Sequence, residues 1–173
     1  MTALTDAPTL RTDRLTLRGP ERGDLDAYGT WMTTSSRLAA MGDLKTAAEA
    51  WNRFVHGIGH WHWHGFGFFT LATHDDPAPL GRVGLLLNPG WQDVELAWHL
   101  FDGAEGRGYA TEAALAVRRW ARAERGIGRL ASYIDAANAR SQAVARRLRA
   151  ATDGARAAHD PDCEVWVHPE ETP

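Results

Sequence analysis

The chain has 173 residues, of which 24% are charged, and its formal net charge is −3. A chain of this length buries roughly two-thirds of its unfolded surface around one core, and no linker-like segment divides it, so we expect a single domain over residues 1–173. One cysteine, Cys163, excludes an intrachain disulfide, and no segment has the pattern of a signal peptide or a membrane span, so we expect a cytoplasmic protein.

Hydrophobic periodicity and turn residues predict the elements in chain order. We expect a strand over 14–18, helices over 21–33 and 46–58, and strands over 66–73, 80–88 and 93–100. A helix over 107–125, a strand over 129–134, a helix over 138–150 and strands over 152–158 and 163–168 follow. Hairpins followed by a strand–helix–strand crossover predict a mixed sheet flanked by helices, the α/β (α+β) class.

Histidines alternate with tryptophans after the second predicted helix. In a strand, His60, His62 and His64 would share one face, as zinc ligands do, but no acidic or cysteine partner accompanies them, so we expect no metal site. Large aromatic side chains are usually core or half-buried supports, which is the role expected for Trp31, Trp51, Trp91, Trp120 and Trp166.

A glycine-rich turn joins the strand over 93–100 to the helix over 107–125. Gly106 and Gly108 allow a tight turn and a close approach to a ligand, and the first amides of the helix have no partner within it. The turn therefore predicts a site for a phosphate-bearing ligand, with an ordinary strand-to-helix loop as the alternative. No Lys–Ser/Thr pair follows and the third glycine of a dinucleotide fingerprint is replaced near Thr111, which disfavours ATP and NAD.

Arginine is concentrated in the second half of the chain. Residues 107–156 contain eleven arginines and four acidic residues, which places a positive field around the predicted phosphate site. A solvated helix face or a polyanionic cofactor explains this field, and the aromatic residues cluster elsewhere, so we expect no nucleic-acid partner.

Six motifs occur in an order typical of one family. They are Thr12-Asp-Arg-Leu-Thr-Leu-Arg18, Gly59-His-Trp61 with Gly65-Phe-Gly67, Leu80-Gly-Arg-Val-Gly84, Val94-Glu-Leu-Ala-Trp98, Glu105-Gly-Arg-Gly-Tyr-Ala110 and Asn138-x-x-Ser141. Together they resemble the GNAT family of N-acetyltransferases, in the RimJ/RimL-like branch of ribosomal-protein-alanine N-acetyltransferases. The resemblance implies the GNAT fold, a mixed, mostly antiparallel twisted sheet of about six to seven strands flanked by about four helices.

The same resemblance implies acetyl-CoA as cosubstrate without a metal, and a primary amine, such as a protein N-terminus or a small molecule, as acceptor. The pyrophosphate would be bound by Gly106, Arg107, Gly108, Tyr109 and Ala110. Glu105 stands where the family has Gln or Arg, and we assign it no contact. Backbone groups of Trp98, His99 and Leu100 would pair with the pantetheine arm, and Asn138 would bind the same arm, cap a helix, or do both.

Acetyl transfer to an amine needs a base for the ammonium and an acid for the departing thiolate. Glu95 is the candidate base, because its apolar neighbours would raise its pKa; its alternative is a solvent-facing carboxylate. The tyrosine that many GNAT enzymes use as the acid is replaced by Ala145, and Ser141 matches the serine of the RimJ/RimL-like branch. Catalysis would thus rest on Glu95 and Ser141, with His60, His62 and His64 as further candidates for the acceptor wall.

The sequence is also compatible with two other functions. One is a CoA-binding sensor on the same fold, and the other is an interaction module whose arginine-rich helices contact an acidic partner. A membrane partner is not expected, and a homodimer is left open. After Arg147, Leu148-Arg149-Ala150 replaces the family's usual Leu-Gly-aromatic, which puts the next loop in question.

Overall fold

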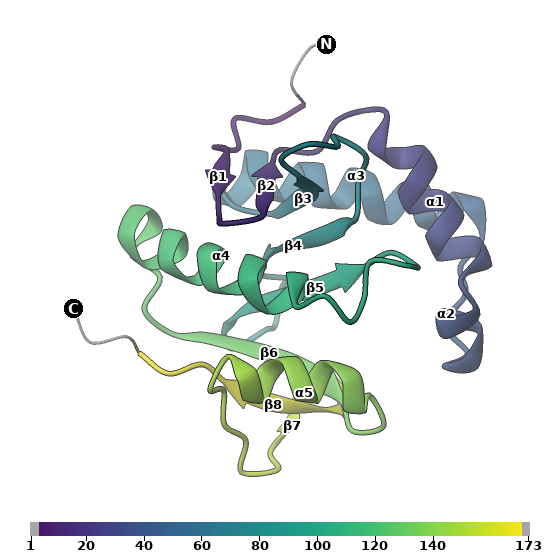
Figure 1. Cartoon of the computed structure of the whole chain (residues 1–173). Coiled ribbons are helices and arrows are strands. Elements are labelled where there is room, and N and C mark those ends of the chain that lie inside the picture. Colours follow the sequence, from purple (N-terminus) through teal and green to yellow (C-terminus); the bar gives the residue numbers. More distant parts are fainter. Residues whose placement is uncertain (1–3, 171–173) are drawn as a thin grey trace.

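A computed structural model of the chain describes residues 4–170, which form one eight-stranded sheet with helices on both faces (Figure 1). The strands are β1 Leu10–Arg11, β2 Leu15–Arg18, β3 Phe68–Thr73, β4 Gly81–Leu86, β5 Val94–Leu100, β6 Leu130–Asp135, β7 Arg156–Ala157 and β8 Asp160–Val167. The helices are α1 Asp24–Thr34, α2 Ser36–Ala40, α3 Ala47–His64, α4 Tyr109–Arg125 and α5 Ala139–Arg147.

The strand order is β1-β2-β3-β4-β5-β6-β8-β7. Every neighbouring pair is antiparallel except β5 and β6, which are parallel and joined through α4. The predicted hairpins and crossover are therefore confirmed, and with them the mixed α/β class. The sheet has one strand more than the upper predicted number because the short β1, which precedes the first predicted strand, pairs with β2.

The two faces of the sheet have different cores. On one face, Val83, Leu85 and Leu96 are fully buried beneath Ala113 and Val117 of α4, whose small side chains let the helix lie close to the strands. On the other face, α1, α2 and α3 share a second core, formed by Tyr28, Trp31, Met32, Leu38, Ala50 and Phe54. In Figure 1, α4 and α5 lie in front of the sheet and α3 lies behind it.

Helix α3 continues six residues beyond its predicted end and includes the whole histidine–tryptophan run. A capping box formed by Thr46 and Glu49 fixes its start, and Gly65, with φ 71°, ends it in the left-handed conformation. The prediction of a strand-like histidine face is therefore wrong. Trp31, Trp120 and Trp166 are buried as predicted and Trp91 is half-buried, but Trp51 is 53% exposed, so its predicted supporting role is also wrong.

The C-terminal region follows the prediction with shifted boundaries. β7 has two residues rather than seven, and β8 begins three residues earlier than predicted. Arg149 has φ 60°, a left-handed conformation that favours glycine, at the position where the family usually has one. None of the helices between residues 4 and 170 is long and apolar enough to cross a bilayer.

Candidate active site

The parallel strands β5 and β6 separate shortly after they meet. They pair only at Val94 with Leu130 and at Glu95 with Ala131, whereas β5 continues to Leu100. A cleft of about 140 Å³ opens between the two strands beyond this point. Because the other edge of β5 is fully paired with β4, the edge facing the cleft offers backbone groups to a ligand.

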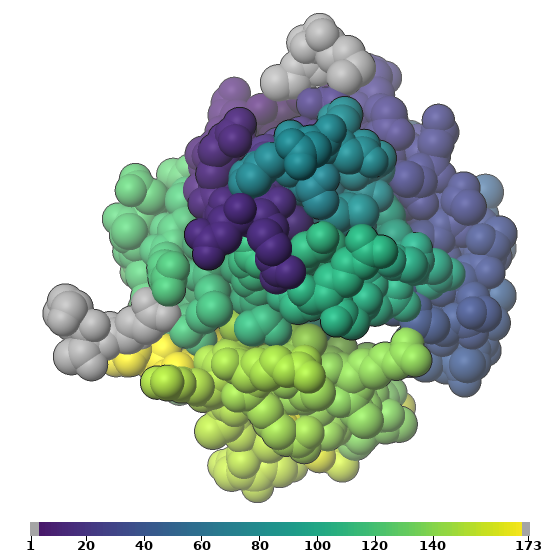
Figure 2. All heavy atoms as spheres, viewed as in Figure 1, coloured from purple at the N-terminus to yellow at the C-terminus, as the bar shows by residue number. Residues whose placement is uncertain are grey.

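This cleft brings together several residues that the sequence indicated. It is lined by Glu95, Leu96, Ala97, Trp98, His99, Ser132, Tyr133, Ile134, Asp135, Asn138 and Ser141. The candidate base, the candidate acid and three of the four predicted pantetheine-binding positions, Trp98, His99 and Asn138, therefore lie along one opening. Leu100 is not among the lining residues, and its carbonyl accepts a hydrogen bond from Arg37. Figure 2 shows α4 in green and α5 in yellow-green, meeting along a boundary on the face that they cover.

The loop after β5 presents the uncapped end of α4. Gly106 and Gly108 have φ 75° and 81°, and no side chain caps the helix at Gly108. The first amides of α4 at Tyr109 and Ala110 consequently carry the unsatisfied donors and partial positive charge that suit a phosphate. The donor set and the adjacent cleft together fit a ligand that has a diphosphate followed by an amide-containing arm.

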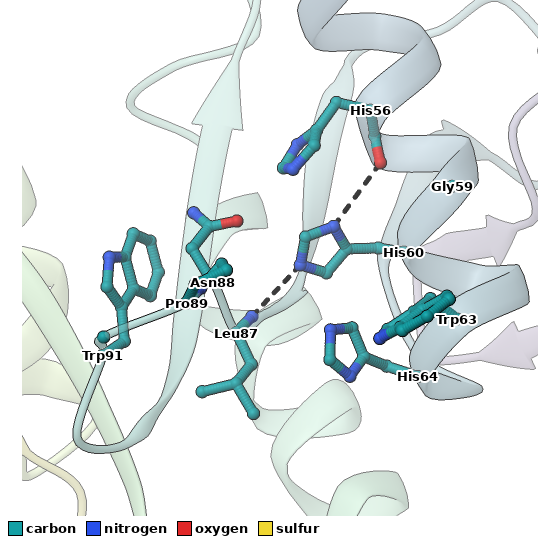
Figure 3. A pocket seen from close by; sticks show the side chains of 10 residues that line it. His56, Gly59, His60, Trp63, His64, Leu87, Asn88, Pro89 and Trp91 are labelled. Atoms are coloured by element: carbon teal, nitrogen blue, oxygen red, sulfur yellow. Dashed lines mark hydrogen bonds between the residues drawn. The ribbon is translucent and has the colours of Figure 1, made fainter.

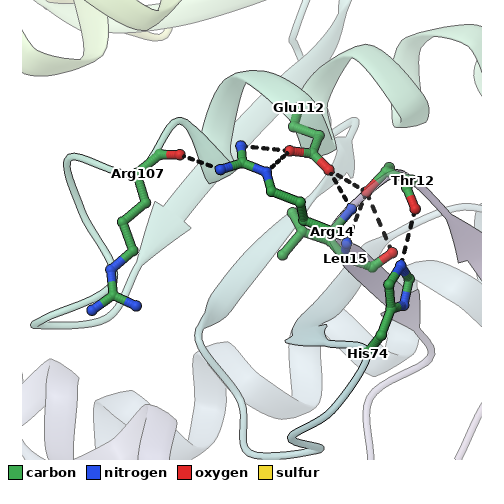
Figure 4. Close-up of polar contacts among 6 residues, drawn as sticks. All are labelled: Thr12, Arg14, Leu15, His74, Arg107 and Glu112. Atoms are coloured by element: carbon green, nitrogen blue, oxygen red, sulfur yellow. Dashed lines mark hydrogen bonds and ion pairs between the residues drawn. The ribbon is translucent and has the colours of Figure 1, made fainter.

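Arg14 fixes the backbone of this loop to α4 (Figure 4). Its Nη1 donates to the carbonyl of Arg107 at 2.9 Å, and its Nε donates to Glu112 of α4 at 2.7 Å. The Arg107 side chain is exposed and points away from this network, as Figure 4 shows. The loop backbone is thus fixed from behind while the Arg107 guanidinium stays available to an anion.

Arg37 of α2 neutralises the acidic residues of the loop, a role that the sequence analysis missed. Its Nε lies 2.8 Å from Glu105 Oε1 and its Nη2 lies 2.8 Å from Asp102 Oδ1. The same Nη2 donates to the Leu100 carbonyl at 2.7 Å. Glu105 is therefore paired with a cation, although it lies in a loop that is proposed to bind an anion. The presence of Glu105 in the loop was a sequence signal that a nearby cation is needed, but it did not indicate which arginine supplies that cation.

Glu95 lies at the closed end of the cleft, on the sheet face that it shares with Ala97 and His99. Burial raises the pKa of Glu95 to about 7, and backbone hydrogen bonding by Tyr133 opposes this rise only in part. A carboxylate with a pKa near neutrality can both accept and release a proton at physiological pH. The site therefore holds one group suited to general-base chemistry.

Asn138 and Ser141 meet at the start of α5. Asn138 is the N-cap residue, and its Oδ1 accepts from the Ser141 amide at 3.0 Å. The capping role is thus confirmed, and both residues also line the cleft. Ala145, at the position of the family's tyrosine, is fully buried in the core with Trp166.

A larger pocket of about 560 Å³ lies between α3 and the loop that joins β4 to β5 (Figure 3). On the α3 side, the rings of His56, His60 and His64 follow one another at helical spacing, with centroids 4.6 and 5.0 Å apart. His62 instead contacts the Leu4 carbonyl at 2.9 Å. Across residues 4–170, no group of three or more His, Cys, Asp or Glu side chains has the geometry of a metal site.

Trp91 connects this pocket with the cleft. Its ring lies 5.3 Å from the ring of Tyr133, which lines the cleft, and it stacks on His159 at 4.4 Å. His159 in turn meets Tyr133 edge-on at 4.5 Å. This contact could not be predicted from the sequence, because its three residues come from separate segments.

Comparisons with known proteins agree with this architecture. The family model described as an acetyltransferase (GNAT) domain matches residues 14–151. The acetyltransferase from Agrobacterium tumefaciens str. C58 is 34% identical, with a TM-score of 0.88 over 98% of this chain and 99% of that one. A search of curated proteins found no match.

Two more distant structures share the fold alone. The ribosomal-protein-S5-alanine acetyltransferase from Vibrio fischeri is 14% identical, with a TM-score of 0.71 over 94% of this chain and 96% of that chain. RimL, a ribosomal L7/L12 alpha-N-protein acetyltransferase in complex with coenzyme A, is 16% identical, with a TM-score of 0.67 over 93% and 97%.

Proposed function

Because the chain belongs to the GNAT acetyltransferase family, we propose that it binds acetyl-CoA at the α4 loop and the β5–β6 cleft and transfers the acetyl group to a primary amine, with Glu95 as general base. The observation that carries this proposal is that β5, whose residue Glu95 lines the cleft, leads directly along the chain into the glycine loop and the uncapped start of α4. We also propose, on the order of its motifs, that the chain belongs to the RimJ/RimL-like branch; RimL shares its fold.

The residues have separate tasks along the bound cosubstrate. The amides of Gly106 to Ala110 and the Arg107 guanidinium hold the diphosphate, and the edge of β5 at Trp98 pairs with the pantetheine amides, whereas the Leu100 carbonyl is already engaged by Arg37. Asn138 adds a side-chain contact to that arm while it caps α5. Acetyl-CoA supplies an activated acetyl thioester when bound.

Glu95 prepares the acceptor. An amine arrives mostly as an ammonium, which has no lone pair with which to attack a carbonyl. The ionised Glu95 carboxylate accepts one proton from that ammonium, and its pKa of about 7 makes this acceptance more favourable than it would be for an ordinary glutamate. Glu95 is half-buried on β5, so the proton is accepted by a group that the strand holds in place.

Ser141 assists on the side of the leaving group. Its hydroxyl lines the same cleft as Glu95 and can donate a hydrogen bond to a sulfur that gains negative charge. The Asn138 cap fixes the first turn of α5 and with it the backbone of Ser141. Ser141 thereby takes the role of the tyrosine that many GNAT enzymes use, because this chain has Ala145 at the position of that tyrosine.

A pair of variants tests this division of roles. With the best acceptor from a panel of primary amines, Glu95→Gln keeps the shape but cannot accept a proton, so turnover should fall about 10²-fold near neutral pH. The deficit should shrink toward alkaline pH, where solution supplies free amine. Ser141→Ala should instead keep its deficit across the pH range, because its lost function concerns the thiolate.

Acetyl-CoA affinity, measured by titration, should be nearly unchanged in Glu95→Gln, which separates a chemical defect from a binding defect. Full activity of this variant at every pH would mean that another group or water removes the proton.

A further inference from the structure

We propose that the acceptor is a small amine with a single positive charge on an aromatic or similarly apolar scaffold, and that this scaffold binds in the pocket between α3 and the β4–β5 loop. The inference rests on the proposed acetyltransferase function and names its substrate class.

Pairing between β4 and β5 connects the pocket lining with the strand that carries the proposed base. Leu86 pairs with Glu95 across β4 and β5, so the two side chains share one face of the sheet. Leu87, the next residue, lines the pocket, and its amide hydrogen-bonds His60 Nε2 at 3.2 Å. Trp91 lines the pocket from the other side and contacts Tyr133 of the cleft. An amine could therefore reach toward Glu95 while the rest of the molecule stays in the pocket.

The pocket wall is aromatic and carries no acidic side chain. Its lining residues are His56, Gly59, His60, Trp63, His64, Leu87, Asn88, Pro89, Gly90 and Trp91. Indole, imidazole and proline surfaces favour flat apolar groups, and indole faces also attract an ammonium. A polyamine or an aminoglycoside would bring several further charges into a wall without a carboxylate to pair them, which costs solvation free energy.

His60 keeps this wall uncharged near its centre. Its Nε2 accepts from the Leu87 amide, so the proton of the neutral ring lies on Nδ1, which faces the His56 carbonyl at 3.4 Å. Burial, followed by the neighbouring His56, lowers the pKa of His60. These contacts favour the neutral ring. A neutral ring does not repel the single ammonium of a monoamine, and it offers no negative charge to the several ammonium groups of a polyamine.

Trp63 is the clearest sign that something binds here. Trp63 is 85% exposed although it lines the pocket, which is an open hollow of about 560 Å³ and has room for a small molecule. Trp51 on the same helix is also exposed, at 53%, but does not line the pocket. The chain therefore provides a matched pair of exposed indoles, one inside the proposed acceptor site and one outside it.

The test compares 2-phenylethylamine with spermidine, an aminoglycoside and a short peptide with a free N-terminus, each with saturating acetyl-CoA, and measures products by mass spectrometry. The kcat/KM for 2-phenylethylamine should exceed that of the other three at least about tenfold. Trp63→Ala should raise the KM for 2-phenylethylamine about fivefold or more without changing the KM for acetyl-CoA, whereas Trp51→Ala should change neither.

A variant that adds a carboxylate to the pocket, and so changes which amine is preferred, gives a second readout. His56 is exposed at the pocket rim, so His56→Asp should fold and should improve spermidine relative to 2-phenylethylamine, because it adds the missing carboxylate. Preference of the parent protein for the polyamine, the aminoglycoside or the peptide would overturn the inference, as would equal effects of Trp63→Ala and Trp51→Ala. Failure to acetylate any of the four while acetyl-CoA still binds also overturns it, whereas failure to bind acetyl-CoA contradicts the proposed function itself.

Discussion

Glu95 lies where burial raises its pKa to about 7, so its ionisation opposes folding. Between its ordinary pKa and about 7, the folded state holds more protons than the unfolded state, and the stability of the parent protein should fall as pH rises through this window. Glu95→Gln removes the penalty. We expect the variant to be more stable than the parent by roughly 1–3 kcal/mol near pH 8, and the difference to vanish below about pH 4, under the ordinary pKa of a glutamate.

Urea unfolding of the two proteins across this pH range measures the difference without an acceptor. A constant difference between about pH 5 and pH 8 would contradict the buried, titrating carboxylate, because a packing effect of Gln does not depend on pH.

Individual residues differ in how far the sequence could specify them. Glu95 and Ser141 could be proposed from motifs, and the structure places both along one cleft. Arg37 could not, because its partners Asp102 and Glu105 are more than sixty positions away and any of many arginines could have met them. Arg149 illustrates a third case: the departure from glycine was visible, but only the structure shows that the arginine adopts the left-handed conformation.

At the scale of elements, Arg37 of α2 supplies the cation that pairs with the loop before α4, and the α2 N-cap residue Ser35 donates a hydrogen bond to Asp102 of the same loop. Arg37→Ala would leave Asp102 and Glu105 without their cation beside the proposed diphosphate site, and the affinity for acetyl-CoA should fall about fivefold. Adding Asp102→Asn and Glu105→Gln to that variant should restore most of the affinity, because the uncompensated charges are then gone.

Arg119→Ala removes the same charge from an exposed position on α4 and is the control for net charge. Isothermal titration at low and moderate salt measures all of these affinities. If the triple variant binds as weakly as Arg37→Ala, Arg37 acts by holding the loop in shape and not by neutralising it.

Helix α3 shows why one element was predicted with the wrong extent. The alternation of His and Trp has the two-residue period of a strand, but Phe54, Gly57 and Trp61 are buried at helical spacing. The capping box at Thr46 and Glu49 and the terminating Gly65 were both visible in the sequence as helix boundaries. A helix between these two boundaries predicts that His56, His60 and His64 lie on one face.

At the scale of the whole molecule, the order of hairpins and crossover predicted the sheet, because such connections leave few topologies open. The separation of β5 from β6 could not be predicted, since it depends on where two distant strands stop pairing. That separation leaves an open edge of β5 beside Glu95, and the uncapped end of α4 follows β5 along the chain. The account of acetyl-CoA binding depends on this arrangement more than on any single side chain.

Thermal unfolding with and without acetyl-CoA tests that account most directly. At a hundred times its Kd, acetyl-CoA should stabilise the protein by about 2.7 kcal/mol, a Tm increase of several degrees, while ATP and NAD do much less. Gly108→Val should abolish the increase. Gly126→Val introduces the same side chain at a left-handed glycine at the other end of α4 and should keep it. No Tm increase in the parent protein, or an undiminished increase in Gly108→Val, would contradict binding at this loop.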